Sequence, residues 1–406
     1  FSFVPYENVA NTKDLTRGNT DVSATNQAQG YRIPRGQLAN SDTLCVGGNT
    51  YFNSCTQISV KNCDGPIYIR NFFVNGEAAT GEGRDVGIDI VNSDVLLENC
   101  IASRCSEAGF KFNNSKVTLS RSAASYRNYK LTSTTTRQAE TGYGFHAINS
   151  DVNVSSLPTS GISGSGVDCV VMASRNYAGW VLDNSKLTGG VQRAVATDEL
   201  RSSIIGAELN TGYGAIINNS QVNVKGLFDI YGNDKGIEAN NSHVVYENLC
   251  IEGHSGEGIR SKNSAFVFDS PTNPLQAGQS DRHQLQLSGN GQHLDLMKNS
   301  SFGFKRKNKI PSKYGNSLFK DSHGVIKWAS DDGNSITNRN VLPAISVNDG
   351  SEVDLLHASI RVDGTAENIA NVPSYGRGIK ATNNSKVSCF GTGSGCTFVY
   401  GPAGDT

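Results

Sequence analysis

Acidic and basic side chains that lie close together in the sequence are the first candidates for chemistry. Asp198, Glu199 and Arg201 fall together in the stretch "ATDELRS". Paired carboxylates can act as general acid and base on a glycosidic bond, and clustered acids can hold calcium while an arginine removes a proton. These three residues are therefore the predicted catalytic set if the chain is an enzyme that cleaves polysaccharide. Solvated surface charge is the alternative explanation, and we favour a non-catalytic protein.

Tyrosine and arginine side chains are concentrated in the middle of the chain. Aromatic rings and hydrogen-bonding arms suit sugar rings, so we expect glycan contacts in this region, with ordinary packing as the alternative. The predicted glycan-binding residues are Tyr126, Arg127, Tyr129, Tyr177, Arg193 and Tyr213.

The histidines and cysteines predict neither a metal site nor a cofactor. None of the seven histidines has a second histidine at metal-ligand spacing, and no Ser-His-Asp or Cys-His relay can be picked out from their order. The nine cysteines are scattered, which indicates reduced thiols used as small core residues in a protein completed in a reducing cytosol. A Cys55–Cys63 or a Cys389–Cys396 bridge remains an alternative.

The fold must position all of these residues, and a repeated Asn-Ser pair is the signal that indicates the fold. Successive asparagines are spaced by 22, 35, 35, 35, 22 and 22 residues. Within one period, as in "GIDIVNSDVLLENC", apolar and polar residues alternate, which is the pattern of strands with one buried face. Helical repeats need longer units, so the period indicates a coil of short strands. The predicted ladder asparagines are Asn92, Asn114, Asn149, Asn184, Asn219, Asn241 and Asn263.

The predicted fold is all-β: a right-handed, single-stranded parallel β-helix with about 22 residues per turn and lateral loop insertions. Each asparagine is expected at the bend between two strands, with its amide stacked on the amide of the next turn. A glycine recurs five residues before most of these asparagines, as at Gly87, Gly144 and Gly236, and we expect it to permit a backbone bend.

The repeat also predicts the organisation of the chain. Residues 1–45 lack it and are expected to form an N-terminal cap or attachment arm. Residues 46–406 form the β-helix, with an irregular insertion at 271–340. The three longer turns have extra segments that we expect to lie side by side as one lateral lobe within 123–212. A basic stretch at 297–313 is interpreted as a solvated loop, or as a patch for an anionic glycan or a neighbouring subunit.

The period and the asparagine ladder resemble the right-handed parallel β-helix (pectin-lyase-like) family, which includes pectate lyases, polygalacturonases and phage tailspikes. The resemblance covers most of the chain and implies the fold more strongly than the activity. Fragments of polygalacturonase motifs occur as "NTD" at 19–21, "GHS" at 253–255, "DDG" at 331–333 and "RGIK" at 377–380. Their order and separation are incompatible with one site of that kind, so we treat them as chance.

Composition restricts the function further. The formal net charge is −1, so no global field attracts nucleic acid, and no apolar run is long enough for membrane insertion. The first residue is Phe1 rather than Met, and we expect a fragment or a processed product.

These features predict a bacteriophage virion appendage: a tail fibre, tailspike or baseplate-associated protein that gives a rigid stalk and binds host-surface glycan. The expected partners are two further copies in a homotrimer, other virion proteins and a host polysaccharide. The expected location is the virion, assembled in the host cytoplasm, or alternatively the extracellular space. The alternative function is a polysaccharide lyase or glycoside hydrolase. A secreted adhesin is a third reading, and the cysteines count against it.

Overall fold

The computed structural model describes the chain in nineteen segments and divides it into two compact units, Phe1–Gly212 (unit 1) and Tyr213–Thr406 (unit 2). Every regular element in these segments is a β-strand. Within them, no helix has the length and hydropathy needed to cross a bilayer. The described segments are 2–5, 30–32, 51–63, 67–76, 85–126, 128–131, 137–140, 142–155, 170–189, 191–193, 200–202, 204–268, 285–288, 290–304, 318–322, 345–356, 359–364, 379–390 and 397–402.

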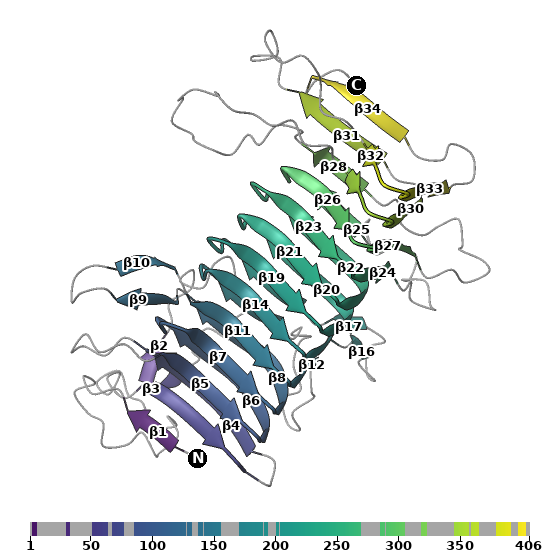
Figure 1. Cartoon of the computed structure of the whole chain (residues 1–406). Coiled ribbons are helices and arrows are strands. Elements are labelled where there is room, and N and C mark those ends of the chain that lie inside the picture. Colours follow the sequence, from purple (N-terminus) through teal and green to yellow (C-terminus); the bar gives the residue numbers. More distant parts are fainter. Residues whose placement is uncertain are drawn as a thin grey trace. The chain divides into compact units, whose positions relative to one another are not determined.

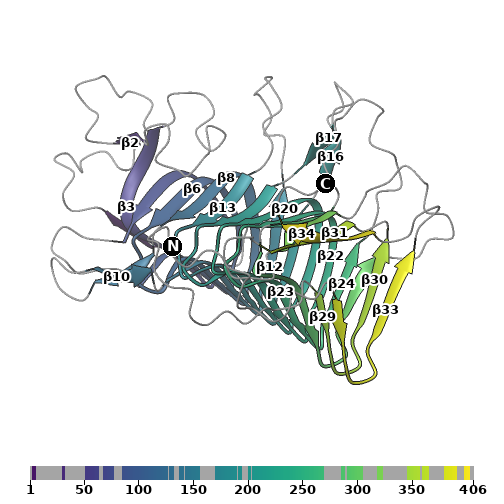
Figure 2. The same ribbon diagram turned by 90° about the horizontal axis from the view of Figure 1, so that it is seen from above.

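Unit 1 consists of parallel strands arranged in three rows, which we name A, B and C (Figures 1 and 2). The chain passes through A, B and C in turn, and we call one such passage a rung. Row A contains β5 (Val86–Val91), β7 (Ala108–Asn113), β11 (Tyr143–Ile148) and β14 (Ala178–Asp183). Three long strands run through rows B and C: β4 (Ile67–Asn75), β6 (Asp94–Ser103) and β8 (Lys116–Tyr126). Later rungs use separate strands, β12 (Asp151–Ser155) and β15 (Lys186–Gly189) in row B, and β13 (Val170–Ser174) and β18 (Ile204–Glu208) in row C.

The first rung of unit 1 differs from the others because antiparallel strands flank it. β3 (Tyr51–Lys61) pairs in parallel with β4 and β5, while β1 (Ser2–Pro5) and β2 (Gly30–Arg32) pair with it antiparallel. Of the predicted cap at 1–45, only these two short strands lie within the described residues.

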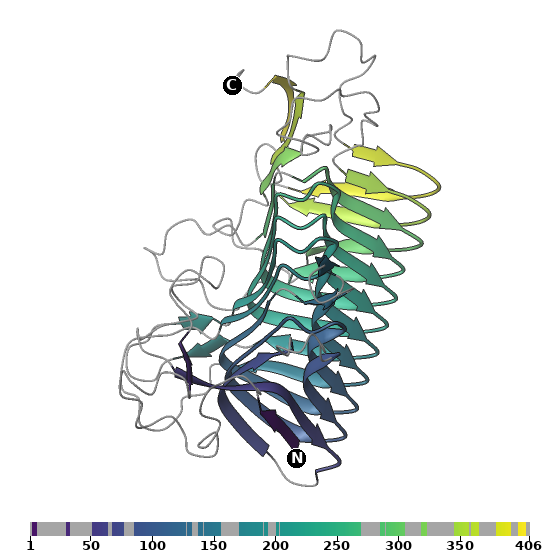
Figure 3. The same cartoon turned by 90° about the vertical axis from the view of Figure 1, so that its left-hand side faces the viewer.

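Unit 2 repeats the three-row arrangement (Figure 3). Row A contains β19 (Tyr213–Asn218), β21 (Lys235–Asn240), β23 (Glu257–Lys262), β26 (Gln292–Met297), β29 (Ile345–Val347) and β32 (Ile379–Ala381). β20 (Gln221–Tyr231) and β22 (His243–Glu252) run through rows B and C. Row B continues with β24 (Ala265–Phe268), β27 (Ser301–Phe304), β30 (Glu352–Leu356) and β33 (Lys386–Phe390). Row C continues with β25 (Leu285–Ser288), β28 (Leu318–Ser322), β31 (Ser359–Gly364) and β34 (Thr397–Pro402). Within the predicted irregular insertion at 271–340, the described residues therefore form strands that take part in the rungs.

Equivalent residues of successive rungs face each other across the parallel strands. Ser93 and Ser115, which are 22 residues apart, are hydrogen bonded, and so are Ser115 and Ser150, which are 35 apart. The strands alternate inward and outward residues, as the burial pattern of β20 shows. The prediction that parallel strands of successive rungs pair through equivalent residues is confirmed.

The interior of unit 1 contains a column of large apolar side chains in row A. Ile88, Phe110, Phe145 and Trp180 occupy equivalent positions, and each is at most 1% exposed. The rings of Phe110 and Phe145 stack with centroids 4.6 Å apart, and those of Phe145 and Trp180 stack at 4.2 Å. Parallel pairing in register therefore converts a repeated apolar position into a continuous stack.

The recurring glycines act by a different mechanism from the one expected. Gly144 and Gly236 lie inside or beside strands, and neither has positive φ. A Cβ on Gly236 would overlap the carbonyl oxygen of Gly258 in the next rung, and one on Gly144 would overlap that of Gly179. The expectation of a special backbone bend is wrong, because these positions require glycine for the close approach of neighbouring strands.

The extra segments of the longer rungs do not share one position. The first lies between row C of one rung and row A of the next, and it contains the antiparallel pair β9 (Tyr129–Leu131) and β10 (Arg137–Glu140). The other two lie between rows B and C, and the last contains the pair β16 (Val191–Arg193) and β17 (Leu200–Ser202). The expectation that all three lie side by side is corrected, because chain order puts the first at another corner of its rung.

Candidate functional site

The predicted catalytic residues are only partly described. Asp198 and Glu199 lie outside the described residues, and Arg201 is the middle residue of β17, where its backbone pairs with Gln192.

The predicted glycan-binding residues fall in several places. Tyr126 ends β8, Tyr129 begins β9 and Arg193 ends β16, while Arg127 lies outside the described residues. Tyr177 occupies the bend between β13 and β14 in unit 1, and Tyr213 begins β19 in unit 2. The side chains of Tyr126, Tyr129 and Arg193 lie outside the described residues, so glycan binding by this set stays a prediction.

Tyr177 belongs to a small aromatic and polar patch on row A of unit 1. Its side chain is 39% exposed, and its ring centroid lies 6.4 Å from that of Tyr143. Tyr143 stands edge-on to His146, whose Nε2 lies 3.0 Å from Asp183 Oδ2. Burial raises the pKa of the Tyr143 hydroxyl, and the nearby Tyr177, Asp183 and Glu107 raise it further. A His-Asp pair can serve as a general base, but Nε2 is engaged by Asp183 and Nδ1 is buried, so this imidazole is not presented to a substrate.

The ladder asparagines share one backbone conformation. All seven have φ between 47° and 50°, the left-handed region that asparagine tolerates better than other side-chain-bearing residues. A backbone N–H of this kind donates to a carbonyl oxygen of the next rung. Asn92 donates to Asn113 and Asn241 donates to Lys262, in each case the residue just before the equivalent asparagine. Each asparagine therefore turns the chain from row A to row B while preserving pairing between rungs.

Two side-chain ladders run along this bend in unit 2. The Asn263 amide donates to Asn241 Oδ1 (2.8 Å), and the Asn241 amide donates to Asn219 Oδ1 (3.2 Å). Beside them, each serine backbone N–H donates to the serine Oγ of the next rung, from Ser220 through Ser242 and Ser264 to Ser300. In unit 1 the same serine ladder runs from Ser93 to Ser185.

A second, buried ladder lies at the bend between rows C and A, and it was not predicted from the sequence. In unit 1, the Asn128 N–H donates to Asn176 Oδ1 (3.2 Å) and the Asn176 N–H to Asn210 Oδ1 (2.8 Å). In unit 2, the Asn233 N–H donates to His254 Nδ1 (3.1 Å) and the His254 N–H to Asn290 Oδ1 (3.2 Å). All of these side chains are at most 3% exposed. Asparagines a few residues before Gly179, Gly214 and Gly236 were the available signal, but a histidine takes the same place once.

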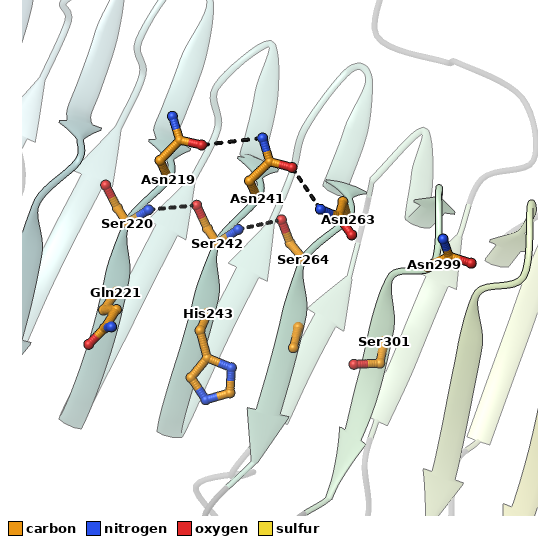
Figure 4. A pocket seen from close by; sticks show the side chains of 11 residues that line it. Asn219, Ser220, Gln221, Asn241, Ser242, His243, Asn263, Ser264, Asn299 and Ser301 are labelled. Carbon is orange, nitrogen blue, oxygen red and sulfur yellow. Dashed lines mark hydrogen bonds between the residues drawn. The ribbon is translucent and has the colours of Figure 1, made fainter.

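The asparagine and serine ladders of unit 2 line a groove with a volume of about 390 Å³ (Figure 4). The asparagines are exposed and the serines beside them are buried. The residue after each serine points outward at the start of its row B strand. Figure 4 shows two of these outward residues, Gln221 and His243, below the hydrogen-bonded amides. We name this site the asparagine groove; its lining residues are Asn219, Ser220, Gln221, Asn241, Ser242, His243, Asn263, Ser264, Ala265, Asn299 and Ser301.

Ionisable side chains gather elsewhere on unit 2. Arg260 on row A contacts Glu257 and donates from Nε to Asp295 Oδ2 at 3.1 Å, so these charges satisfy one another. On row C, Asp229 faces Cys250 across β20 and β22, and Glu252 lies two residues further along. Burial raises the pKa of the Asp229 carboxyl, and the charge of Glu252 raises it further.

Free thiols occur among the described cysteines. Cys100 and Cys105 are fully buried, and burial raises the pKa of each to about 12, which keeps them as neutral thiols. Cys63 is also free, so the alternative of a Cys55–Cys63 bridge is wrong; Cys396 lies outside the described residues. Among the described residues, no group of three or more histidine, cysteine or acidic side chains is arranged to hold a metal ion.

Comparisons of the chain with family models, with curated proteins and with solved structures found no match.

Proposed function

We propose that this chain is a structural and adhesive protein, a β-helical part of a bacteriophage virion appendage that binds a host-surface glycan. The observation that carries the proposal is the pair of hydrogen-bonded ladders in unit 2, which stiffen the bend between rows A and B and leave a polar groove outside it. Side-chain ladders add directional bonds between rungs to those of the backbone, so the surface they support is held in one geometry.

We also propose that the strands wind in a right-handed sense with about 22 residues per turn. Right-handed winding is the hand of nearly all parallel β connections, and a 22-residue turn agrees with the hydrogen-bonded serine pairs that lack inserted segments. The longer separations then represent the same turn with a lateral insertion.

Virions purified from the source of the chain provide the test. Antibodies raised against the purified protein are expected to label a tail or baseplate structure in negative-stain electron microscopy. Antibodies against an unrelated protein of similar size serve as the control. If the antibodies label cell envelopes and leave the virions unlabelled, the virion assignment is overturned.

A polysaccharide-cleaving enzyme is the second candidate, favoured by Asp229 and Glu252. Two partly buried carboxylates on adjacent strands, with the pKa of one raised, are the arrangement in which one carboxyl donates a proton and the other acts as base or nucleophile. Exposed Tyr231 on the same strand as Asp229 offers a ring surface for a sugar.

An assay of polysaccharide cleavage tests this enzymatic candidate. Acidic and neutral bacterial polysaccharides are incubated with the chain, and reducing ends and unsaturated uronate absorbance are measured. An enzyme of this kind loses its activity in Asp229→Asn and keeps it in Asp94→Asn, which changes an exposed acid of unit 1. If the wild-type chain releases no product from any substrate, the enzymatic candidate is rejected.

A further inference from the structure

The two units carry the same serine ladder and the same left-handed asparagines, but they differ in the outward side chains beside them. In both, exposed asparagines are followed by buried serines and then by an outward residue on row B. In unit 1 these outward residues alternate in charge across paired strands: Asp94, Lys116, Asp151 and Lys186. In unit 2 four paired residues at the same place are neither lysine, arginine, aspartate nor glutamate: Gln221, His243, Ala265 and Ser301. Glu352 and Lys386 follow them in the next two rungs.

Short side chains leave room for the groove beside the ladder of unit 2. Ala265 and Ser301 are short, whereas lysines and aspartates with a hydrated charge occupy the equivalent positions of unit 1. The groove volume of about 390 Å³ falls in the range of about 300–1,000 Å³ typical of small-molecule sites. Its lining contains no lysine, arginine, aspartate or glutamate.

The ladder amides retain hydrogen-bonding capacity toward solvent. An asparagine side chain has two N–H donors and an oxygen with two lone pairs. Asn241 uses one N–H toward Asn219 and accepts one bond from Asn263, and it remains exposed. Its second N–H and second lone pair can therefore meet a partner that both donates and accepts, and Gln221 adds another amide beside it.

We propose that the asparagine groove is a binding site for an uncharged glycan chain lying along the ladder. Sugar hydroxyls both donate and accept hydrogen bonds, which matches the amides, and parallel strands present one such amide about every 4.8 Å along the groove. The inference deepens the proposed adhesive role by giving it a site and a ligand class.

The same features disfavour two other ligands. A peptide that adds a strand needs an unpaired strand edge, and β22 is paired with β20 on one side and with β24 on the other. An anionic glycan would lose hydration without gaining a cation, because the lining provides no lysine or arginine.

The direct test measures binding of the full chain to an array of neutral and acidic bacterial oligosaccharides. Neutral glycans are expected to bind, and Ala265→Lys, which places in the groove the residue type found at Lys116 and Lys186, should weaken binding by about tenfold or more. The control, Asn223→Lys, adds the same charge to an exposed position of β20 outside the groove lining and should bind as the wild type does. Binding confined to acidic glycans, binding to none, or equal binding by Ala265→Lys overturns the inference.

A gain-of-function variant tests the comparison between the units. Asp94→Gln, Lys116→His, Asp151→Ala and Lys186→Ser together copy the outward row of unit 2 into unit 1. Calorimetric titration with the best-bound neutral oligosaccharide should then give about one additional site per chain, with circular dichroism used to check that the fold is kept. An unchanged stoichiometry in a folded variant counts against the inference. These assays use the purified chain alone, so their outcome is independent of whether the antibodies label virions.

Discussion

Single residues at the two bends do different work although both bends rely on asparagine. At the bend between rows A and B, which we call the outer bend, Asn92, Asn219 and Asn241 combine a left-handed backbone with an exposed amide. At the bend between rows C and A, which we call the inner bend, the amide of Asn176 or Asn290 is buried, and its oxygen accepts a hydrogen bond from a backbone N–H of the preceding rung. The same residue type is therefore used once for its tolerance of positive φ and once for its acceptor oxygen.

His254 takes the place of one of these buried asparagines in unit 2, and we expect its imidazole to make the unit sensitive to acid. At the equivalent positions the asparagine oxygens accept a backbone N–H, which assigns the acceptor role to Nδ1 of His254 and requires a neutral ring. Burial lowers the pKa of His254 to about 4, although the carbonyls of Asn233 and Ile230 and the charge of Asp234 oppose the shift.

The free energy of unfolding should therefore fall as the pH drops from about 6.5, where the unfolded histidine begins to bind a proton, to about 4, where the folded one does. The loss attributable to this residue is up to about 3 kcal/mol over that interval. Urea unfolding of the wild type, His254→Asn and His254→Gln at several pH values measures it. Both variants keep an acceptor that does not titrate and should lose this part of the pH dependence; an unchanged dependence would contradict the assignment.

At the scale of elements, the close approach of the strands is what the recurring glycines provide. Gly236 lies next to Gly258 in the neighbouring rung, so Gly236→Ala must push β21 and β23 apart or shift the chain. Overpacking of this kind costs about 1–3 kcal/mol. Gly256→Ala is the control, because its Cβ would approach no atom closer than 3.2 Å. In thermal unfolding, the Tm of the Gly236→Ala variant should be lower than the Tm of the Gly256→Ala control. The reverse order would show that the strands can separate at little cost.

The aromatic column in row A contributes to stability as a unit. Phe145 lies between Phe110 and Trp180 and is 1% exposed, so Phe145→Ala removes two ring contacts and leaves a cavity. We expect a loss of about 3–5 kcal/mol for alanine and a smaller one for leucine, which fills more of the space. Denaturant unfolding can be followed by Trp180 fluorescence in a Trp328→Phe background, where Trp180 is the single tryptophan. Equal losses for the two variants would show that ring stacking, rather than filled volume, is responsible.

At the scale of the whole molecule, the sequence was informative where a residue recurs at every rung. The Asn-Ser spacing was sufficient to predict parallel strands joined at equivalent positions, because a unit that cannot bury its face alone must stack on its neighbours. The buried ladder at the inner bend was not predicted from the sequence, because Asn128, Asn176 and Asn210 are separated by unequal insertions and His254 interrupts the pattern in unit 2. The groove was not predicted because it depends on a contrast between the two units, visible only when strand pairing puts Lys116 and His243 in equivalent places.

Long-range pairing throughout both units should make folding slow. Hydrogen-bonded serines lie 22 or 35 residues apart, so each rung must close a loop before it gains its ladder bonds. Refolding from denaturant is expected to take about seconds or longer and to lose yield to aggregation at higher protein concentration. Manual-mixing fluorescence at several concentrations measures both; complete refolding within milliseconds would contradict this view of the topology.

The serine ladder has a consequence for chemical ageing. An asparagine followed by serine slowly loses its amide when the serine backbone nitrogen attacks the side-chain carbonyl carbon. In the rungs that nitrogen is occupied, since the N–H of Ser115 donates to Ser150 and that of Ser242 donates to Ser264, in a buried position. The Asn-Ser pairs that build the bends are therefore protected from deamidation for as long as the rungs remain paired, which gives an exposed, asparagine-rich surface a long working life.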